Sequence, residues 1–450
     1  MERRNFLKGA APLAIASASA ASPIVLADGA AGPNRVAVMT KNLNPAIQKA
    51  RDAAMAVLQP TEAQLQRGLE LHADAVVFDS YGFSPRSAID GEKFKEEVLA
   101  GASDQELDDL REDMSMTRCV TDAGELTEYR EGWLASGVTC VFQNAGQEGQ
   151  DPMRLIKRLA RFTYTTDMLR EFVSKAVTPA DVEAAKAANR RCLYMTGNGV
   201  PLTQDWNSIP DELRYVRIFY QLGIRMMHLT YQRRNMIGDG CGETTNAGLS
   251  DFGKAVVAEM NRVGVIVDCA HSGWQTSLEA AQTSARPMVA SHSVAGALYP
   301  HIRSKPDEVI RAIADTDGLI GICCISRFLR GKGDLNALLD HIDHVAKNFG
   351  VDHVAIGTDI SYNSRNSSAE NKKAAVGGLR RKRADFRSLW PKDDFLASEE
   401  ADLSLSWTNW PLYTVGLVQR GYTDEEIRKI IGGNVMRVAK ANFVDSVPAV

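Results

Sequence analysis

The chain has 450 residues, enough for one large domain or two of ordinary size, and 44% of its residues are hydrophobic. That fraction is typical of a folded globular protein and excludes an intrinsically disordered chain. The formal net charge of −4 leaves no basic excess, so neither nucleic acid nor an acidic membrane surface is an expected partner.

The amino terminus carries the pattern of an export signal. Arg3 and Arg4 open the sequence RRNFLK, which precedes a short apolar stretch, rich in small residues, that ends at Ala27. This order predicts a twin-arginine signal peptide over residues 1–27, export through the twin-arginine translocase and a periplasmic mature protein. No later segment offers the roughly eighteen consecutive apolar residues of a spanning helix, so no permanent membrane span is expected.

Residues 28–64 are expected to form an amino-terminal extension, with helix predicted over 41–72. Eight apolar runs follow, separated by helical patterns, and such runs are typical of buried parallel strands. They cover residues 75–79, 137–142, 192–196, 224–230, 264–270, 287–291, 318–325 and 353–359. This alternation predicts an α/β fold, a single (β/α)8 TIM barrel over 65–445. The alternative is a doubly wound open sheet, which lacks a glycine-rich phosphate fingerprint after its first strand.

Two segments read as insertions into this barrel. Residues 80–130 form a long, charged excursion after the first strand, and residues 361–406 follow the last one. Because loops after barrel strands lie on the active face, both insertions are expected to shape access for a substrate. The basic run 380–383 in the second insertion reads as a solvated surface patch.

Polar residues follow three of the predicted strands. His271 ends the run GVIVDCAH, His292 ends PMVASH, and Asp359 ends HVAIGTD. The carboxyl ends of barrel strands form the active face, so these side chains are expected to converge. Two imidazoles and one carboxylate with an open position form a known catalytic zinc arrangement, in which bound water has a pKa of about 7.

The chain resembles the membrane (renal) dipeptidase family, the M19 metallopeptidases. The resemblance covers roughly residues 65–440. It rests on GLSDFGKAVVAEMNRVGVIVDCAHSG, RPMVASHSVAGAL, HIRSKPDEVIRAIA, HVAIGTDIS and YTDEEIRKIIGGNVMRVAK, which together are specific. It implies a (β/α)8 barrel of the metal-dependent hydrolase (amidohydrolase) type that holds two bridged zinc ions. Members cleave dipeptides, and some open β-lactam rings.

The resemblance also implies roles for single residues. His271 and His292 match the zinc-ligand histidines after strands five and six. Asp359 matches the aspartate after strand eight, which binds the other zinc. Arg303 stands where the family has an arginine that contacts the substrate carboxylate, so a small molecule carrying a carboxylate is the expected substrate.

Elsewhere the chain departs from the family pattern. Tyr81 and Phe83 occupy the two ligand positions of the family's first-strand D-G-H-x-D motif. Thr196 stands where the family has the glutamate that bridges both ions, and Tyr231 where it has a substrate-contacting histidine. A bridging carboxylate offsets the repulsion between two cations, so its loss predicts a degenerate site with at most one zinc ion. Asp79 or Tyr81 is a possible fourth contributor.

Two other histidines compete for the same roles. His72 and Asp74 have the family's H-x-D spacing but precede the first strand, which predicts a place at the wrong end of the barrel. His228 lies inside the fourth strand and reads as a satisfied core histidine.

Three functions are compatible with this pattern. The favoured one is a periplasmic zinc hydrolase that cleaves a dipeptide-like amide, with His271 and His292 as metal ligands. In it, Asp359 is a ligand or the base that takes a proton from water, and Arg303 binds a carboxylate. The second is a catalytically degenerate barrel that acts as a ligand-binding or maturation factor. The third is a non-hydrolytic enzyme in which Tyr81 and Tyr231 move protons. The sequence leaves the oligomeric state open.

Overall fold

The computed structural model describes residues 33–146, 151–205, 207–375 and 386–446. The predicted signal peptide and the basic run 380–383 therefore lie outside the described residues. Within them, no helix is long and apolar enough to cross a membrane.

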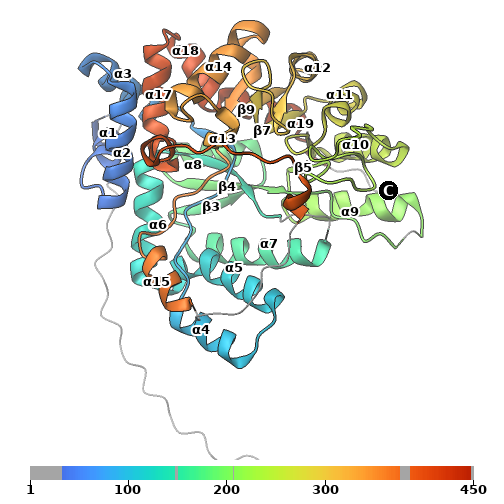
Figure 1. Cartoon of the computed structure of the whole chain (residues 1–450), viewed down its shortest axis with the longest axis horizontal. Coiled ribbons are helices and arrows are strands. Elements are labelled where there is room, and N and C mark those ends of the chain that lie inside the picture. The colour runs from blue at the N-terminus through green and yellow to red at the C-terminus, as the bar shows by residue number, and fades with distance from the viewer. Residues whose placement is uncertain (1–32, 147–150, 206, 376–385, 447–450) are drawn as a thin grey trace, which may run out of the picture.

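Parallel strands form the centre of the molecule, and helices surround them (Figure 1). The eight strands that pair in order around the barrel are β1 (Phe78–Gly82), β2 (Cys140–Asn144), β4 (Arg191–Gly197), β5 (Met226–His228), β6 (Ile266–Asp268), β7 (Val289–Ala295), β9 (Leu319–Ile322) and β10 (Val354–Ile356). Each falls in or overlaps one of the eight predicted runs, so the predicted barrel is confirmed. Two short strands were not predicted: β3 (Val173–Ala176) pairs with β4, and β8 (Ser304–Lys305) pairs with β7.

The barrel closes between its last and first strands through the chain that follows β10. The Asp359 N–H donates to the Tyr81 carbonyl at 3.0 Å, and the Phe83 N–H donates to the Ile360 carbonyl at 3.2 Å. These bonds bring the end of β1 against the residue that follows the last strand, so both contribute to the same face of the barrel.

Most of the helices lie around the outside of the strands. Those between the strands are α6 (Ala123–Ser136), α7 (Pro152–Met168), α8 (Pro179–Ala187), α9 (Ile209–Gln221), α10 (Asp251–Val263), α11 (Trp274–Thr283), α12 (Asp307–Asp315), α13 (Ser326–Leu329) and α14 (Leu335–Phe349). After β10 come α16 (Glu399–Ser404), α17 (Trp410–Gln419), α18 (Asp424–Arg428) and α19 (Asn434–Asn442). Residues of α19 pack into the apolar core at the amino end of the barrel, so that end is filled by protein.

The amino-terminal extension forms α1 (Pro33–Thr40), α2 (Pro45–Leu58) and α3 (Glu62–Asp74), which lie beside α17 (Figure 1). The single helix predicted over 41–72 is wrong in one respect, because the helix is broken between α2 and α3. Gln59 ends α2 in the left-handed conformation (φ 47°), and Thr61 starts α3 with a capping box to Gln64.

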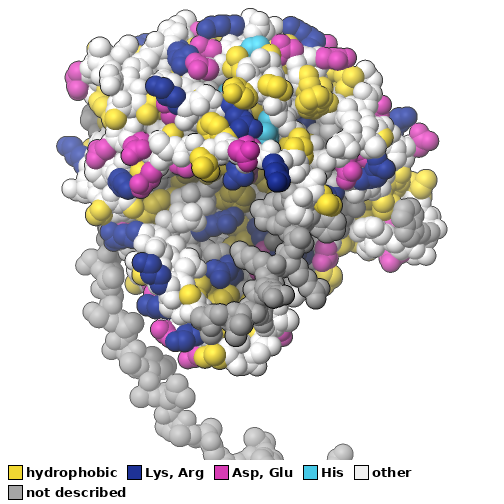
Figure 2. All heavy atoms as spheres, in the orientation of Figure 1, with side chains coloured by type: hydrophobic (Ala, Val, Ile, Leu, Met, Phe, Trp, Pro, Cys, Tyr) yellow, Lys and Arg dark blue, Asp and Glu magenta, His cyan; other side chains and the backbone are white. Residues whose placement is uncertain are grey.

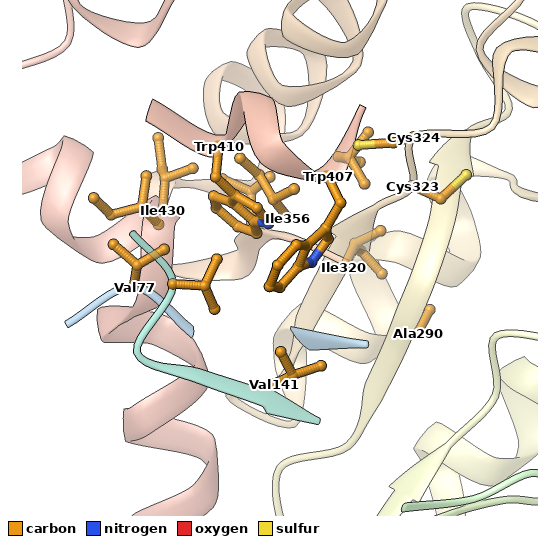
Figure 3. Packing of buried hydrophobic residues seen from close by; sticks show 14 of the residues in the cluster. Val77, Val141, Ala290, Ile320, Cys323, Cys324, Ile356, Trp407, Trp410 and Ile430 are labelled. Atoms are coloured by element: carbon orange, nitrogen blue, oxygen red, sulfur yellow. The ribbon is translucent and has the colours of Figure 1, made fainter. Parts of the chain in front are cut away.

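Large aromatic side chains fill the space between the strands and α17. Trp407 and Trp410 are buried and lie near Val77, Val141 and Ile356 (Figure 3). The Trp407 indole N–H also donates to the buried Asp79 carboxylate at 3.1 Å. This packing fixes the position of β1 from outside the barrel.

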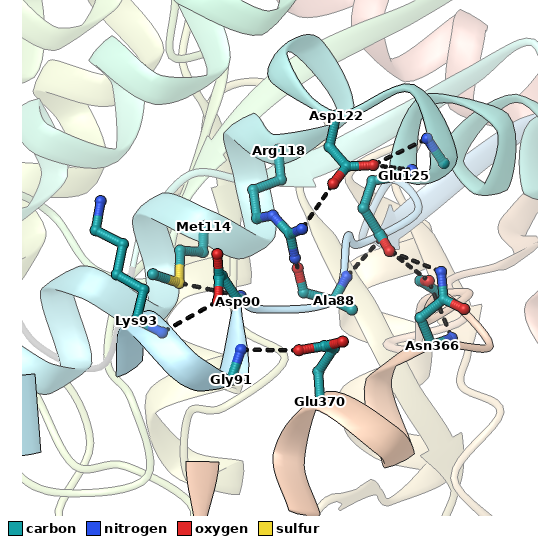
Figure 4. A network of polar contacts seen from close by, with 12 residues as sticks. Ala88, Asp90, Gly91, Lys93, Met114, Arg118, Asp122, Glu125, Asn366 and Glu370 are labelled. Atoms are coloured by element: carbon teal, nitrogen blue, oxygen red, sulfur yellow. Dashed lines mark hydrogen bonds and ion pairs between the residues drawn. The ribbon is translucent and has the colours of Figure 1, made fainter. Parts of the chain in front are cut away.

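The two predicted insertions contact each other. The first contains α4 (Gly91–Ala100) and α5 (Asp104–Thr121), and the second contains α15 (Ser367–Ala374). The Gly91 N–H at the start of α4 donates to the Glu370 carboxylate at 2.9 Å (Figure 4). Glu125 accepts from the Ala88 N–H at 2.7 Å and from the Asn366 amide at 2.9 Å. The insertions therefore form one joined layer on the side of α4, α5 and α15. On the face drawn in Figure 2, acidic and basic side chains are interspersed.

Candidate metal and substrate site

Three neighbouring strands direct polar side chains into the barrel. The apolar core at its amino end includes one residue from each of β5, β6 and β7: Met226, Ile266 and Val289. Because side chains alternate along a strand, the residues two positions further on face the same interior. Those residues are His228, Asp268 and Ser291, and all are fully buried. A polar layer thus lies directly above the apolar one.

The two histidines predicted as ligands come together above this layer. His271 Nε2 lies 2.9 Å from His292 Nε2, and both side chains are buried. Burial lowers the pKa of each imidazole well below its usual value, and the positive charge of Arg303 lowers it further. Both rings are therefore neutral, which is the form that binds a metal ion.

Asp268 organises two of the histidines. His228 Nε2 lies 2.7 Å from Asp268 Oδ2. The Ser291 hydroxyl donates to the same Oδ2, and Ser291 Oγ lies 2.8 Å from His292 Nδ1. Burial by itself raises the pKa of Asp268, but His228 and the bonds from Ser291 outweigh burial and the net pKa is lowered. Asp268 is therefore an ionised carboxylate that holds His228 directly and His292 through Ser291.

Two tyrosines cover the histidine pair. The Tyr81 ring stacks on His292 with centroids 3.8 Å apart, and the Tyr231 ring stacks on His271 at 4.1 Å. The Tyr81 hydroxyl donates to Asn198 Oδ1 at 2.5 Å. Burial, and next Asp359, raise the pKa of Tyr81 well above its usual value, so its hydroxyl stays protonated. Both predicted tyrosines thus lie at the site, and each stacks the face of its ring on an imidazole.

Arg303 lies directly behind the pair. Its side chain is buried, Nη2 donates to the His292 carbonyl at 3.1 Å, and Nε has no partner within the described part of the chain. The guanidinium also lies 5.1 Å above the Phe328 ring. Its charge acts on both imidazoles, whose pKa values it lowers.

Asp359 follows β10 in the left-handed conformation (φ 57°), which costs a non-glycine residue energy and marks a constrained position. Burial raises the pKa of its carboxyl to about 6, while Arg303, His228 and Arg86 oppose the increase. Asp359 thus shares the electrostatic environment of Arg303 and His228. The donor atoms that lie within 4.8 Å of one another belong instead to His228, Asp268 and His292, counted over the described residues.

The residues that replace family ligands make other contacts in this structure. The Thr196 hydroxyl donates to the Met226 carbonyl at 3.0 Å. Phe83 lies under the Arg86 guanidinium at 4.4 Å. Asp79 accepts from the Thr358 N–H at 2.9 Å and from the Thr358 hydroxyl at 2.6 Å, besides Trp407. Both oxygens of the Asp79 carboxylate therefore already accept hydrogen bonds from Thr358 and Trp407, and Asp79 is not available as a fourth ligand.

The competing pair His72 and Asp74 lies elsewhere, as predicted. His72 is fully buried between α3, α6 and α17, with Nδ1 2.8 Å from Thr414 Oγ1 and Nε2 2.8 Å from the Ser136 carbonyl. Asp74 forms an ion pair with Arg428 at 3.0 Å. Neither contributes to the site.

His228 requires a correction. It is buried and has a carboxylate partner, as expected of a core histidine, but it lies inside the histidine cluster, with its ring centroid 5.2 Å from that of His271 and 5.3 Å from that of His292.

Asp268 was not among the residues predicted from the sequence. Two signals were available: an aspartate within an otherwise apolar run, and the two-residue spacing from Met226 to His228, which turns His228 inward.

A pocket of about 560 Å³ lies near the loop that carries His271, and none of the histidines of the cluster lines it. Its lining includes Cys241, Trp274, His301, Arg330 and Asp393. The Cys241 N–H donates to the His271 carbonyl at 2.8 Å, so the pocket wall contacts the backbone of His271. Pockets of this volume hold ligands of the size of a dipeptide or a small drug.

The residues present fit one zinc-type ion better than two. Neutral imidazoles with converging nitrogen atoms suit such an ion, and His228 Nδ1 and His271 Nδ1 are buried without a hydrogen-bond partner among the described residues. No carboxylate stands at the bridging position, which is held by the Thr196 hydroxyl. The Arg303 charge near the pair opposes a second cation.

Comparison with known proteins agrees with the fold. The chain matches the membrane dipeptidase family (peptidase family M19) over residues 70–370. Dipeptidase tcpJ of Claviceps purpurea is 30% identical over 230 residues, which are 50% of this chain and 46% of that protein. An uncharacterized dipeptidase of Schizosaccharomyces pombe, C3A11.10c, gives the same identity over 50% and 48%. The chain spans about half the length of the curated relatives it matches.

Solved structures share the barrel over most of the chain. An amidohydrolase from Pseudomonas aeruginosa superposes with a TM-score of 0.59 at 24% identity, over 83% of this chain and 98% of that one. The probable dipeptidase PvdM from the same organism gives 0.59 at 19% identity, over 84% and 98%. A metallopeptidase from Rhodobacter sphaeroides, liganded with a phosphinate mimic of the dipeptide L-Ala-D-Ala, gives 0.55 at 17% identity, over 82% and 100%.

Proposed function

The chain belongs to the membrane dipeptidase family, peptidase family M19, and from that premise we propose that it is a single-metal hydrolase of a dipeptide-like amide. The observation that carries the proposal is the approach of His271 Nε2 and His292 Nε2 to 2.9 Å, between two rings that burial keeps neutral. Converging neutral imidazoles provide a place for an ion, and the Arg303 guanidinium on the His292 backbone provides a charge for a substrate carboxylate.

His271 and His292 hold the ion in this proposal. A bound zinc-type ion supplies Lewis acidity that activates water near neutral pH and polarises an amide carbonyl. Ser291 and Asp268 keep the His292 ring in one orientation, because the serine hydroxyl bonds both the carboxylate and His292 Nδ1. Tyr81 and Tyr231 cover the two rings and keep bulk water from them.

Asp359 and Arg303 act on the substrate. Asp359 takes the proton from the attacking water, a role that suits a carboxyl whose pKa burial has raised to about 6. Arg303 pairs with the substrate carboxylate through the donor that the protein leaves without a partner. The substrate class is therefore a small amide that carries a free carboxylate, such as a dipeptide.

We further propose that the protein acts in the periplasm after export by the twin-arginine route. Arg3 and Arg4, followed by a short apolar stretch, support this location. Replacing both with lysine is expected to abolish periplasmic accumulation in cell fractionation. An unchanged periplasmic yield would contradict the proposed route.

A second candidate function is supported by the tyrosines. Tyr81 lies 3.8 Å from His292 between ring centroids and fills space on the side where the family's first-strand ligands stand. A barrel in which tyrosine side chains fill the place of metal ligands suits a ligand-binding or maturation factor. It also suits an enzyme in which tyrosine hydroxyls move protons. A purified protein that binds no ion at micromolar zinc favours this candidate.

The test combines metal content with hydrolysis by the purified protein. One zinc equivalent per chain and measurable cleavage of dipeptides with a free carboxylate are expected. Arg303→Met is expected to raise KM for the free acid and to leave the amidated dipeptide unaffected, because only the free acid offers an anion. Two zinc equivalents with efficient hydrolysis would refute the single-metal site, and absence of hydrolysis with zinc bound would refute the hydrolase.

A further inference from the structure

Three histidines from consecutive strands of the barrel form a nearly regular triangle. The ring centroids of His271 and His292 are 4.9 Å apart, those of His228 and His271 are 5.2 Å apart, and those of His228 and His292 are 5.3 Å apart. Three imidazoles bound tetrahedrally to one zinc ion at about 2.0–2.1 Å place their centroids about 5 Å apart. The triangle therefore has the size of a three-histidine metal site.

The hydrogen bonds of His292 direct the lone pair of Nε2 toward His271. The Ser291 hydroxyl donates to Asp268 Oδ2. Ser291 Oγ must then accept from His292 Nδ1, which carries the proton. His292 Nε2 consequently carries a lone pair, and it lies 2.9 Å from His271 Nε2. Ser291 itself is held from the other side, since its carbonyl accepts from the Ser80 hydroxyl at 2.7 Å.

His228 has the matching arrangement. Its Nε2 lies 2.7 Å from Asp268 Oδ2, within the distance of an ion pair. Its Nδ1 is buried and has no hydrogen-bond partner within the described residues. A carboxylate on one ring nitrogen with the other nitrogen free is the arrangement that orients metal-binding histidines. Asp268 thus serves two of the three rings at once.

Asp268 itself has no oxygen to spare for an ion. Its Oδ1 accepts from the Ala270 N–H at 2.9 Å and from the Ser291 N–H at 3.1 Å. Its Oδ2 contacts His228 and the Ser291 hydroxyl. Although its carboxylate lies within 4.8 Å of nitrogens of His228 and His292, these contacts make it an orienting partner.

We propose that His228, His271 and His292 together bind one zinc-type ion, with His228 contributing the nitrogen that Asp268 leaves free. The inference rests on the proposed function and names its metal site. In this arrangement a histidine inside β5 replaces the ligands lost from the first strand, where Tyr81 and Phe83 stand. Asp359 is then left free of the ion and available as a base.

X-ray absorption at the zinc edge tests the proposal on the wild-type protein loaded with one equivalent of Zn²⁺. Three imidazoles per zinc are expected. Two imidazoles together with a carboxylate oxygen would overturn the proposal. This measurement needs no variant, so it decides the question even if replacement of His228 prevents folding.

Competition titration with a chelator gives an independent measure of zinc affinity. His228→Gln is expected to lower the affinity more than a hundredfold, and Asp268→Asn by about 10–100-fold, as for the loss of an orienting partner. The matched control is His341→Gln. His341 is equally buried, but both its nitrogens have partners, the Ala295 N–H at 3.1 Å and the Leu329 carbonyl at 3.0 Å. Its replacement is expected to change zinc affinity less than threefold.

The outcomes separate this proposal from the proposed function. Zinc bound by three imidazoles in a protein that hydrolyses no dipeptide supports the site and refutes the hydrolase. Dipeptide hydrolysis with zinc bound equally well by wild type and His228→Gln refutes the site and leaves the hydrolase standing.

Discussion

Two groups of buried histidine in this protein have opposite hydrogen-bonding states. His72, between α3, α6 and α17, has a partner at 2.8 Å for each ring nitrogen. The triangle of His228, His271 and His292 leaves two Nδ1 atoms buried without a partner among the described residues. Burial lowers the pKa of His72 to about 3, and the pKa values of His271 and His292 are also well below the usual range.

Burial and a lowered pKa therefore do not separate a structural histidine from a functional one. The difference lies in the nitrogens that the protein leaves without partners. An unsatisfied buried polar atom costs folding free energy, and an ion bound within the triangle would satisfy these nitrogens. On this argument His72 stabilises the fold, and the triangle serves an ion. Four predictions test the comparison.

The largest effect is expected for His271→Ala. Only two imidazoles then remain, which is too few for a stable tetrahedral site, so zinc affinity is expected to fall by roughly a thousandfold, more than for loss of an orienting partner. Zinc per chain after dialysis measures this. The truncation also opens a cavity and removes the contact with His292 Nε2, so the metal-free variant should be less stable than the metal-free wild type. Retention of a full zinc equivalent would contradict the assignment of His271.

The next effect is expected for His72→Ala. The substitution leaves the Ser136 carbonyl and the Thr414 hydroxyl without their partner and opens a cavity, so the free energy of unfolding should fall by about 3 kcal/mol. Denaturant unfolding measures the change, and zinc affinity should stay that of the wild type. A loss of zinc binding in a folded His72→Ala protein would break the comparison.

His72 also predicts a dependence of stability on pH. Its pKa is 6.5 in the unfolded chain and about 3 in the folded protein, so below pH 6.5 the unfolded chain binds the extra proton. The stability is complete above pH 6.5 and is lost as the pH falls toward 3, by about 2 kcal/mol between pH 6.5 and 5. The difference in unfolding free energy between wild type and His72→Gln should shrink by that amount. A difference that stays constant over this range would show that His72 does not titrate as described.

The smallest effect is expected at Tyr231, whose ring stacks on His271 at 4.1 Å. Tyr231→Phe keeps the stacked face and should leave zinc affinity nearly unchanged. Tyr231→Ala removes it, and stacking of this kind contributes about 0.5–1.5 kcal/mol, so affinity should fall about 2–10-fold. Chelator competition distinguishes the two variants. Equal losses in both would assign the effect to the hydroxyl.

The barrel and part of its site could be predicted from the sequence because both follow from local pattern. Apolar runs separated by helical segments gave all eight barrel strands, and the residues that end them gave His271 and His292 at the carboxyl face. The sequence also showed that Tyr81, Thr196 and Tyr231 replace family residues at the site. His72 was correctly placed outside the site because it precedes the first strand.

The role of His228 was decided by tertiary structure. Its spacing from Met226 turns it inward, but whether an inward histidine is satisfied depends on residues that neighbouring strands place beside it. Here β6 provides Asp268 for one nitrogen and nothing for the other. That outcome cannot be read from β5 alone.

The directions of Tyr81 and His292 were also set only by the folded protein. Regular alternation would send adjacent residues to opposite faces, yet Ser291 and His292 both reach the site. The pairing register is irregular between Asp79 and Gly82 in β1 and between Ala290 and Ser293 in β7. Such irregularities re-aim side chains, and they arise from packing between strands. The sequence by itself determined which residues lie at the mouth of the barrel, and the contacts between strands determined which of them face one another.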